Sequence, residues 1–158
     1  MIILGIDPGS TRIGFGIIKQ EQNRFQCLAY GTIDNPGKER GADLKNTATE
    51  LATLISQYRP DCAVIEKLFF TKNQKTAMAV SETRGVLVLT CAQHGIPIQE
   101  YTPLQVKQAV ASYGGASKQQ IQRMVQALFG LSEPVRPDDA ADALALALCA
   151  SDPRRMRG

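Results

Sequence analysis

The chain has 158 residues, a hydrophobic fraction of 44% and a formal net charge of +3 at pH 7, as expected for one domain with a real core. Its four scattered cysteines form no C-x-x-C pair, which argues against a disulfide framework or a zinc site and favours reduced core thiols. No apolar run approaches the roughly 20 residues of a membrane span, and the first apolar run lacks the basic segment of a secretion signal. We therefore expect a soluble, cytoplasmic protein whose mild basicity is compatible with a polyanionic partner.

The first part of the chain predicts three antiparallel strands joined by short connections. The strands are expected at residues 2–6, 13–18 and 25–33. The first is a continuous apolar run, typical of a strand buried on both faces, and it ends at Asp7, after which Pro8 and Gly9 turn the chain. Gly14 and Gly16 in the second strand indicate a place where another backbone or a ligand comes close.

The middle of the chain alternates helices and strands. One amphipathic helical face is formed by Leu44, Ala48, Leu51, Ile55 and Tyr58. A short buried strand at 62–65 follows and ends, like the first, on a carboxylate, Glu66. A long helix is expected over 73–94, with a strand as the alternative for 86–89. The second half of this helix is so apolar that it lies either in the core or against another subunit.

The last part predicts one edge-like strand and three helices. Pro97 opens the strand at 97–101, as edge strands permit. Thr102 caps a helix that reaches about Ser112, and Ser117 with Gln120 forms a capping box for the next helix. The face of that helix comprises Ile121, Met124, Val125, Leu128 and Phe129. An Ala/Leu-rich helix over 138–150 follows.

These elements predict one α/β domain over residues 1–151, followed by a basic, disordered tail at 152–158. Its core is a five-stranded mixed sheet flanked by helices, in which three antiparallel strands precede two further strands.

Carboxylates recur at the ends of the buried strands and on the last helix. If the strands that end at Asp7 and Glu66 are parallel neighbours, both side chains emerge at one edge of the sheet. Asp139 and Asp142 lie three residues apart on one helical face, although Asp138 could share the face of Asp142 instead. Oxygen ligands without histidine or cysteine point to Mg²⁺ or Mn²⁺. Sites of this kind often hold two ions, which activate a water and stabilise the leaving oxygen of a phosphodiester.

Each of these acids also has an ordinary interpretation. Asp7 alone would be a turn residue, Glu66 a solvated strand end, and Asp138 and Asp139 carboxylates that favour a helix start. Asp142 is harder to explain in this way, because it stands among alanines in an apolar helix. The joint placement of the acids favours a metal site.

The motifs GIDPGSTRIGFG, AVIEKLFF, TRG, QVKQAV and DDAADALALAL occur in this order along nearly the whole chain. In sequence, order and spacing they resemble the RuvC-type Holliday junction resolvases of the ribonuclease H and retroviral-integrase superfamily. The resemblance implies a ribonuclease H-like sheet and a catalytic, metal-binding set of Asp7, Glu66, Asp139 and Asp142. Some members of the family have histidine at the position of Asp139. The DAADAL match begins at Asp139 and so favours it over Asp138.

The resemblance also suggests DNA contacts. Lys107 and Lys118 match catalytic lysines near the scissile phosphate. Phe69 matches the residue that acts at the junction centre, so Phe69 is the expected DNA contact and Phe70 the expected core residue; the alternatives are that Phe70 acts at the junction instead or that both are core residues. Four further cations are expected either to bind the DNA backbone or to be plain surface charges, namely Lys72, Lys75, Arg84 and Arg123.

The resemblance implies a Mg²⁺-dependent, structure-specific endodeoxyribonuclease that resolves four-way DNA junctions, with Mn²⁺ as a substitute and two ions per subunit when DNA is bound. A homodimer would cut two strands symmetrically, leave 5′-phosphate ends, and work with a branch-migration motor of the RuvA and RuvB type.

Two alternatives come from other classes. An actin- or Hsp70-like ATPase shares the pattern of an apolar strand, an aspartate and a glycine turn, but such proteins need two lobes around the nucleotide. A non-catalytic DNA-binding scaffold on the same fold conflicts with four acids at the site, because a module that binds a polyanion should not carry carboxylates on its DNA face.

Overall fold

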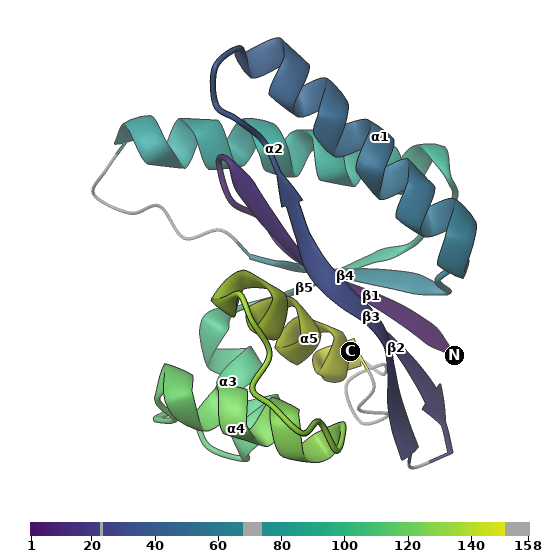
Figure 1. Ribbon diagram of the computed structural model, residues 1–158, viewed down its shortest axis with the longest axis vertical. Helices are drawn as coiled ribbons and strands as arrows, with labels where there is room; N and C mark the ends of the chain where they lie inside the picture. The colour runs from purple at the N-terminus through teal and green to yellow at the C-terminus, as the bar shows by residue number, and fades with distance from the viewer. Residues whose placement is uncertain (23, 68–73, 151–158) are drawn as a thin grey trace.

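The computed structural model describes residues 1–22, 24–67 and 74–150, and its centre is one five-stranded sheet (Figure 1). The strands are β1 (Ile2–Asp7), β2 (Arg12–Glu21), β3 (Arg24–Asp34), β4 (Cys62–Glu66) and β5 (Ile98–Tyr101). Their order in the sheet is β3-β2-β1-β4-β5; β1 to β3 are antiparallel, whereas β4 runs parallel to β1 and β5 parallel to β4. This arrangement confirms the predicted mixed sheet, with β5 at its edge.

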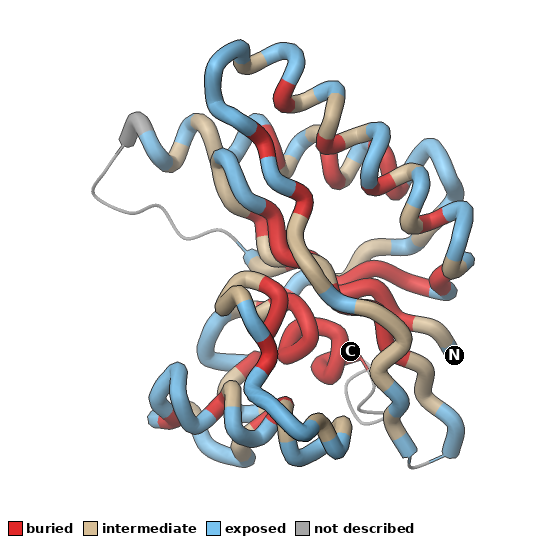
Figure 2. The backbone as a smooth tube through the Cα atoms, viewed as in Figure 1, coloured by how far each residue is buried: buried red, intermediate tan, exposed pale blue. Residues whose placement is uncertain are grey.

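Helices cover both faces of the sheet. On one side lie α1 (Arg40–Tyr58) and α2 (Gln74–Gln93), and on the other lie α3 (Pro103–Ala111), α4 (Lys118–Leu128) and α5 (Asp138–Ala150) (Figure 1). The buried residues therefore form two apolar layers, one on each side of the sheet, with β1 and β4 contributing to both (Figure 2). Residues 86–89 are helical, so the alternative of a strand there was wrong.

Glycines let α5 approach the sheet to backbone contact. A Cβ atom added at Gly5 would lie 1.9 Å from the carbonyl oxygen of Ala143, and one at Gly14 would lie 2.0 Å from that of Asp139. The expectation that another backbone comes close to Gly14 and Gly16 is confirmed, because Gly16 meets Leu144 of the same helix. Since nine of the 13 residues of α5 are alanine or leucine, the helix fits this narrow space and carries its acids to the end of β1.

Both helices that precede α5 begin as the sequence predicts. Thr102 caps α3 in a capping box with Gln105, and Ser117 caps α4 in a second box with Gln120. The box at Ser117 fixes the first residue of α4, which is Lys118. The apolar face predicted for α4 is only partly buried, because Met124 and Leu128 remain 39% and 41% exposed.

The face predicted for α1 was wrong in its first two turns. The residues buried there are Asp43 and Thr47, whereas Leu44 and Ala48 are only half-buried. The physical reason is a polar contact: the buried amide of Asn35 donates to the hydroxyl of Thr47 over 2.9 Å, and that hydroxyl donates to the backbone carbonyl oxygen of Asp43 over 2.9 Å. Hydrophobic periodicity carries no information about such a contact.

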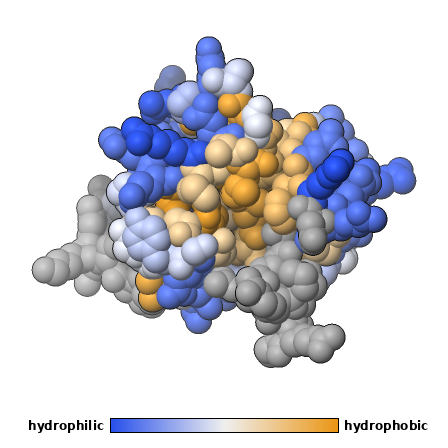
Figure 3. All heavy atoms as spheres, turned by 90° about the horizontal axis from the view of Figure 1, so that it is seen from below, coloured by the Kyte–Doolittle hydropathy of each residue, from blue (hydrophilic) through white to orange (hydrophobic). Residues whose placement is uncertain are grey.

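The cysteines are free thiols, as the sequence predicts. Cys62, Cys91 and Cys149 are buried, and Cys27 is half-buried. Within the described ranges, no helix is both long and apolar enough to cross a membrane. Seen from below, hydrophobic residues gather in the middle of the face between hydrophilic margins (Figure 3).

Candidate active site

The carboxyl ends of β1 and β4 bring two of the predicted acids together. Ile6 pairs with Ile65 in the parallel register, so the residues that follow them, Asp7 and Glu66, leave the sheet at the same edge. Asp142 reaches this edge from α5. Together the three acids line a pocket of about 210 Å³. Its remaining walls are Pro103, Val106, Lys107, Lys118, Ile121, Ala145 and Leu146.

Asp138 and Asp139 have different surroundings at the start of α5. The Asp138 carboxylate accepts hydrogen bonds from Gln122 over 2.9 Å and from Arg136 over 3.1 Å, which direct it toward α4. The backbone of Asp139 instead lies against Gly14, the residue that pairs with Asp7 in the sheet. Asp139 thus lies beside the end of β1, whereas the Asp138 carboxylate is held by Gln122 and Arg136, and neither residue is among those that line the pocket.

Asp7 is the most electrostatically strained of these acids. Burial, followed by the nearby charges of Glu66, Asp142 and Asp139, raises the pKa of Asp7 from 3.8 to about 7. Lys118 opposes this shift only weakly. A cation that enters the pocket would therefore relieve a penalty that the protein otherwise bears near neutral pH.

Glu66 and Asp142 share this penalty. Burial and the charge of Asp142 raise the pKa of Glu66. Burial also raises the pKa of Asp142, even though Lys118 donates to its carboxylate over 2.9 Å. The same hydrogen bond raises the pKa of Lys118, so the two shifts differ in cause: burial dominates for the half-buried acid, and the ion pair dominates for the exposed lysine.

The donor set fits a hard divalent cation. Asp7, Glu66 and Asp142 supply carboxylate oxygens alone, the ligands that Mg²⁺ and Mn²⁺ prefer, and their repulsion is of the kind that a cation neutralises. Across residues 1–22, 24–67 and 74–150, no three acid, histidine or cysteine side chains are already close enough to hold an ion as they stand. Coordination would thus draw the carboxylates closer together than they lie here.

The predicted DNA-binding residues have different positions. Lys107 and Lys118 both line the pocket. Arg84 lies on α2 and forms an ion pair with Glu100 of β5, and Arg123 is exposed on α4. Phe69, Phe70 and Lys72 lie outside the described residues, as does the side chain of Lys75.

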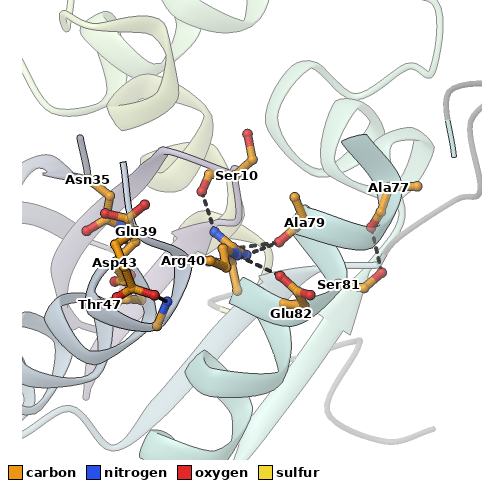
Figure 4. Close-up of polar contacts among 12 residues, drawn as sticks. Ser10, Asn35, Glu39, Arg40, Asp43, Thr47, Ala77, Ala79, Ser81 and Glu82 are labelled. Atoms are coloured by element: carbon orange, nitrogen blue, oxygen red, sulfur yellow. Dashed lines mark hydrogen bonds and ion pairs between the residues drawn. The ribbon is translucent and has the colours of Figure 1, made fainter. Parts of the chain in front are cut away.

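One residue near the site escaped the sequence analysis. Arg40, the first residue of α1, reaches the turn that follows Asp7 and forms a hydrogen bond with the carbonyl oxygen of Ser10 (Figure 4). The sequence offers only a weak signal for it, an arginine at a helix start, where a cation is unfavourable.

Comparisons with known proteins agree with this geometry. The family model described as "Crossover junction endodeoxyribonuclease RuvC" matches residues 3–150. Proteins of that name are similar to the chain. One from Halothermothrix orenii is 48% identical over 99% of this chain and 95% of its own length. One from Alkaliphilus oremlandii is 53% identical over 94% of this chain and 92% of its own length.

Solved structures give the same result. The structure of Thermus thermophilus RuvC has a TM-score of 0.90 and 31% identity, covering 99% of this chain and 96% of that one. The structure of Thermus thermophilus RuvC in complex with Holliday junction substrate also has a TM-score of 0.90, with 29% identity, covering 99% of this chain and 97% of that one. With the family model and these relatives matching nearly its whole length, the chain belongs to the family of RuvC crossover junction endodeoxyribonucleases.

Proposed function

We propose that this chain is a metal-dependent endodeoxyribonuclease that resolves four-way (Holliday) DNA junctions in recombination and repair. The observation that carries this proposal is the convergence of Asp7, Glu66 and Asp142 with two lysines in one pocket, on the fold of a relative solved with that substrate. The proposed catalytic set is Asp7, Glu66, Asp139, Asp142, Lys107 and Lys118.

The proposed metal is Mg²⁺, with Mn²⁺ as a substitute and two ions per subunit once DNA is bound. Asp7, Glu66, Asp139 and Asp142 would hold the ions, which when bound supply an activated water and neutralise the leaving oxygen. Asp7 is central to this set, because it lies at the end of β1 between β2 and β4. The products would carry 5′-phosphate ends.

The two lysines have a separate proposed role, which is to hold the DNA phosphate. Lys118 lies 2.9 Å from the Asp142 carboxylate and 3.7 Å from that of Asp138. With cations held by the carboxylates, its ammonium group would be available to a phosphate oxygen. Lys107 contributes a second positive charge to the pocket from α3.

We expect Lys118→Ala to lower the cleavage rate at saturating junction about 10- to 100-fold, because it removes a charge-assisted contact with the reacting phosphate. Single-turnover cleavage with Mg²⁺ measures this rate. Lys45→Ala is the control, since Lys45 is also exposed but lies on α1, across the sheet from α4. Equal rates for the two variants would contradict the role of Lys118.

The proposed function is tested by incubating the purified protein with a synthetic four-way junction and with a linear duplex, each with Mg²⁺ or with EDTA. We expect symmetric nicks in the junction that require Mg²⁺, and products that a ligase can reseal because they carry 5′-phosphates. Equal cleavage of the duplex, or cleavage in EDTA, would contradict it. Junction binding without cleavage would instead indicate a non-catalytic scaffold.

We also propose that the chain acts as a homodimer on the junction and cooperates with a motor complex of the RuvA and RuvB type. Support for a dimer comes from α2, on which Met78 and Leu89 are 68% and 57% exposed. The domain would span residues 1–151, with residues 152–158 as a basic tail.

Leu89→Glu should therefore dissociate the dimer, because it places a charge in the centre of an apolar contact. Analytical ultracentrifugation at micromolar concentration should give the mass of a monomer for this variant and of a dimer for the original chain. Leu104→Glu is the matched control, as Leu104 is 55% exposed but lies on α3. A wild-type monomer, or dissociation by both variants alike, would count against α2 as the contact.

A further inference from the structure

The guanidinium group of Arg40 joins three segments of the chain (Figure 4). Its Nη1 donates to the carbonyl oxygen of Ser10 over 2.9 Å, and its Nη2 donates to the hydroxyl of Thr83 over 2.9 Å and to the carbonyl oxygen of Ala79. Its Nε pairs with Glu82 over 2.6 Å. Arg40 thus ties the turn after Asp7 to successive turns of α2.

Both ends of this connection are held firmly. Arg40 is the first residue of α1, and the N-cap Glu39 fixes that turn by accepting from the backbone amides of Gly41 and Ala42 over 2.9 Å and 2.5 Å. On α2, Thr83 is fully buried and its hydroxyl donates back to Ala79. The planar guanidinium can serve these acceptors at once, which a single ammonium group does less well.

A second contact holds the next residue of the same turn. The backbone amide of Asn35 donates to the carbonyl oxygen of Thr11 over 2.7 Å, and the Asn35 side chain is held by Thr47 and Asn46. The consecutive carbonyls of Ser10 and Thr11 are therefore both fixed by the segment that leads into α1.

Ser10, whose carbonyl oxygen Arg40 holds, lies three residues after Asp7. The turn that Arg40 restrains begins directly after Asp7, whose carboxylate lines the pocket with Glu66 and Asp142. Displacing a reacting group by about 1 Å can lower a rate roughly 100-fold. Resting on the proposed junction cleavage, we propose that Arg40 is a positioning residue: by holding the Ser10 carbonyl against α2, it fixes the Asp7 carboxylate for the reaction.

Three variants separate the parts of this contact. Arg40→Met removes every hydrogen bond, Arg40→Lys keeps a charge that reaches only some acceptors, and Glu82→Gln removes the ion pair but leaves the Ser10, Ala79 and Thr83 contacts in place. Each is assayed for single-turnover cleavage at saturating junction with Mg²⁺ and for junction affinity in EDTA. Hydrogen exchange of the amides in residues 9–13 is measured in the protein without DNA.

Arg40→Met should cleave about 30-fold more slowly, while its junction affinity stays within about threefold of the original chain. Arg40→Lys should recover part of the rate, and Glu82→Gln should stay within about twofold. Exchange in residues 9–13 should become faster in Arg40→Met and remain unchanged in Glu82→Gln. A loss in rate without a loss in affinity distinguishes positioning of Asp7 from DNA binding, and the recovery by lysine distinguishes it from general destabilisation.

The proposal is overturned if Arg40→Met cleaves at the original rate or if weaker junction binding accounts for its slower cleavage. It is also overturned if Glu82→Gln lowers the cleavage rate as much as Arg40→Met does. If Arg40→Met does not fold, Arg40→Lys decides the matter: it must show a lower rate and faster exchange in residues 9–13 at an unchanged melting temperature. If the original chain cleaves no junction, the proposed function fails, whereas the exchange experiment still tests the restraint on the turn.

Discussion

Asp7→Asn is expected to lower the rate of junction cleavage by about a thousand-fold or more, equivalent to about 4 kcal/mol of transition-state stabilisation, while leaving junction binding intact. The physical reason is the position of Asp7 at the end of β1, where its carboxylate faces Glu66 and Asp142 across the pocket. An amide there cannot carry the negative charge that holds a divalent cation. Single-turnover cleavage and a gel-shift assay in EDTA measure the two properties.

The control for this variant is Asp61→Asn. Asp61 lies at the opposite end of the same pair of strands, where its carboxylate accepts from the backbone amide of Ile2 over 2.6 Å, and an asparagine oxygen can accept in the same way. It should cleave junctions at the original rate. Retention of full cleavage by Asp7→Asn would refute the proposed mechanism.

Asp7→Asn should also stabilise the metal-free protein at alkaline pH. The folded protein holds the pKa of Asp7 at about 7, above its ordinary value of 3.8, so between these values the folded state keeps a proton that the unfolded chain has released. Stability is therefore lost as the pH rises from about 4 to about 7. The full loss in the free energy of unfolding is about 4 kcal/mol, and partial access of Asp7 to solvent reduces this loss to about 2–4 kcal/mol.

Urea unfolding in EDTA at pH 4.5 and at pH 8 measures this effect. The gain in the free energy of unfolding from Asp7→Asn should be small at pH 4.5 and reach its full size at pH 8. An equal gain in the free energy of unfolding at both pH values would show that ionisation of Asp7 does not cause the gain.

Gly5→Ala should have the largest effect on the fold. Its new methyl group would lie 1.9 Å from the Ala143 carbonyl oxygen and 2.7 Å from the Ala147 nitrogen, both backbone atoms that cannot rotate away. Because α5 must then move outward, we expect a loss of about 3 kcal/mol or more, or about 10 °C in the melting temperature. Cleavage should also fall, since the movement carries Asp142 away from Asp7.

Gly31→Ala is the matched control for this change. It adds the same methyl group to an edge strand, but the nearest atoms are those of the Phe15 ring at 3.0 and 3.1 Å, and a half-buried side chain can give way. We expect a loss of about 1 kcal/mol and little effect on the cleavage rate. Calorimetry on both variants measures the difference, and equal losses would show that contact with α5 is not limiting.

The sheet and the placement of the acids could be predicted because their signals are local. The apolar runs that end at Asp7 and Glu66 predict both strand and strand end, whereas the parallel pairing of β1 with β4, which was only a condition in the sequence analysis, is established by the structure. The capping boxes at Thr102 and Ser117 are equally local. The family resemblance then supplied the roles of the acids, which spacing alone left open.

Features that depend on long-range polar contacts could not be predicted. The buried Thr47 is held by a contact with Asn35, which no periodicity reveals. The contacts of Arg40 and Arg84 are decided by partners that lie 30 to 43 residues away for Arg40 and 16 residues away for Arg84. Sequence patterns describe which side of a helix is apolar, whereas they do not identify the partner of an individual charge.

The direct contact of α5 with the sheet has a consequence for how this enzyme can vary. No side chain lies between the helix backbone and Gly5 or Gly14, so the distance between the acids on α5 and those on the strands does not depend on the size of intervening core residues. Substitutions in the apolar layer beneath α1 and α2 should therefore leave the spacing of the proposed catalytic acids unchanged.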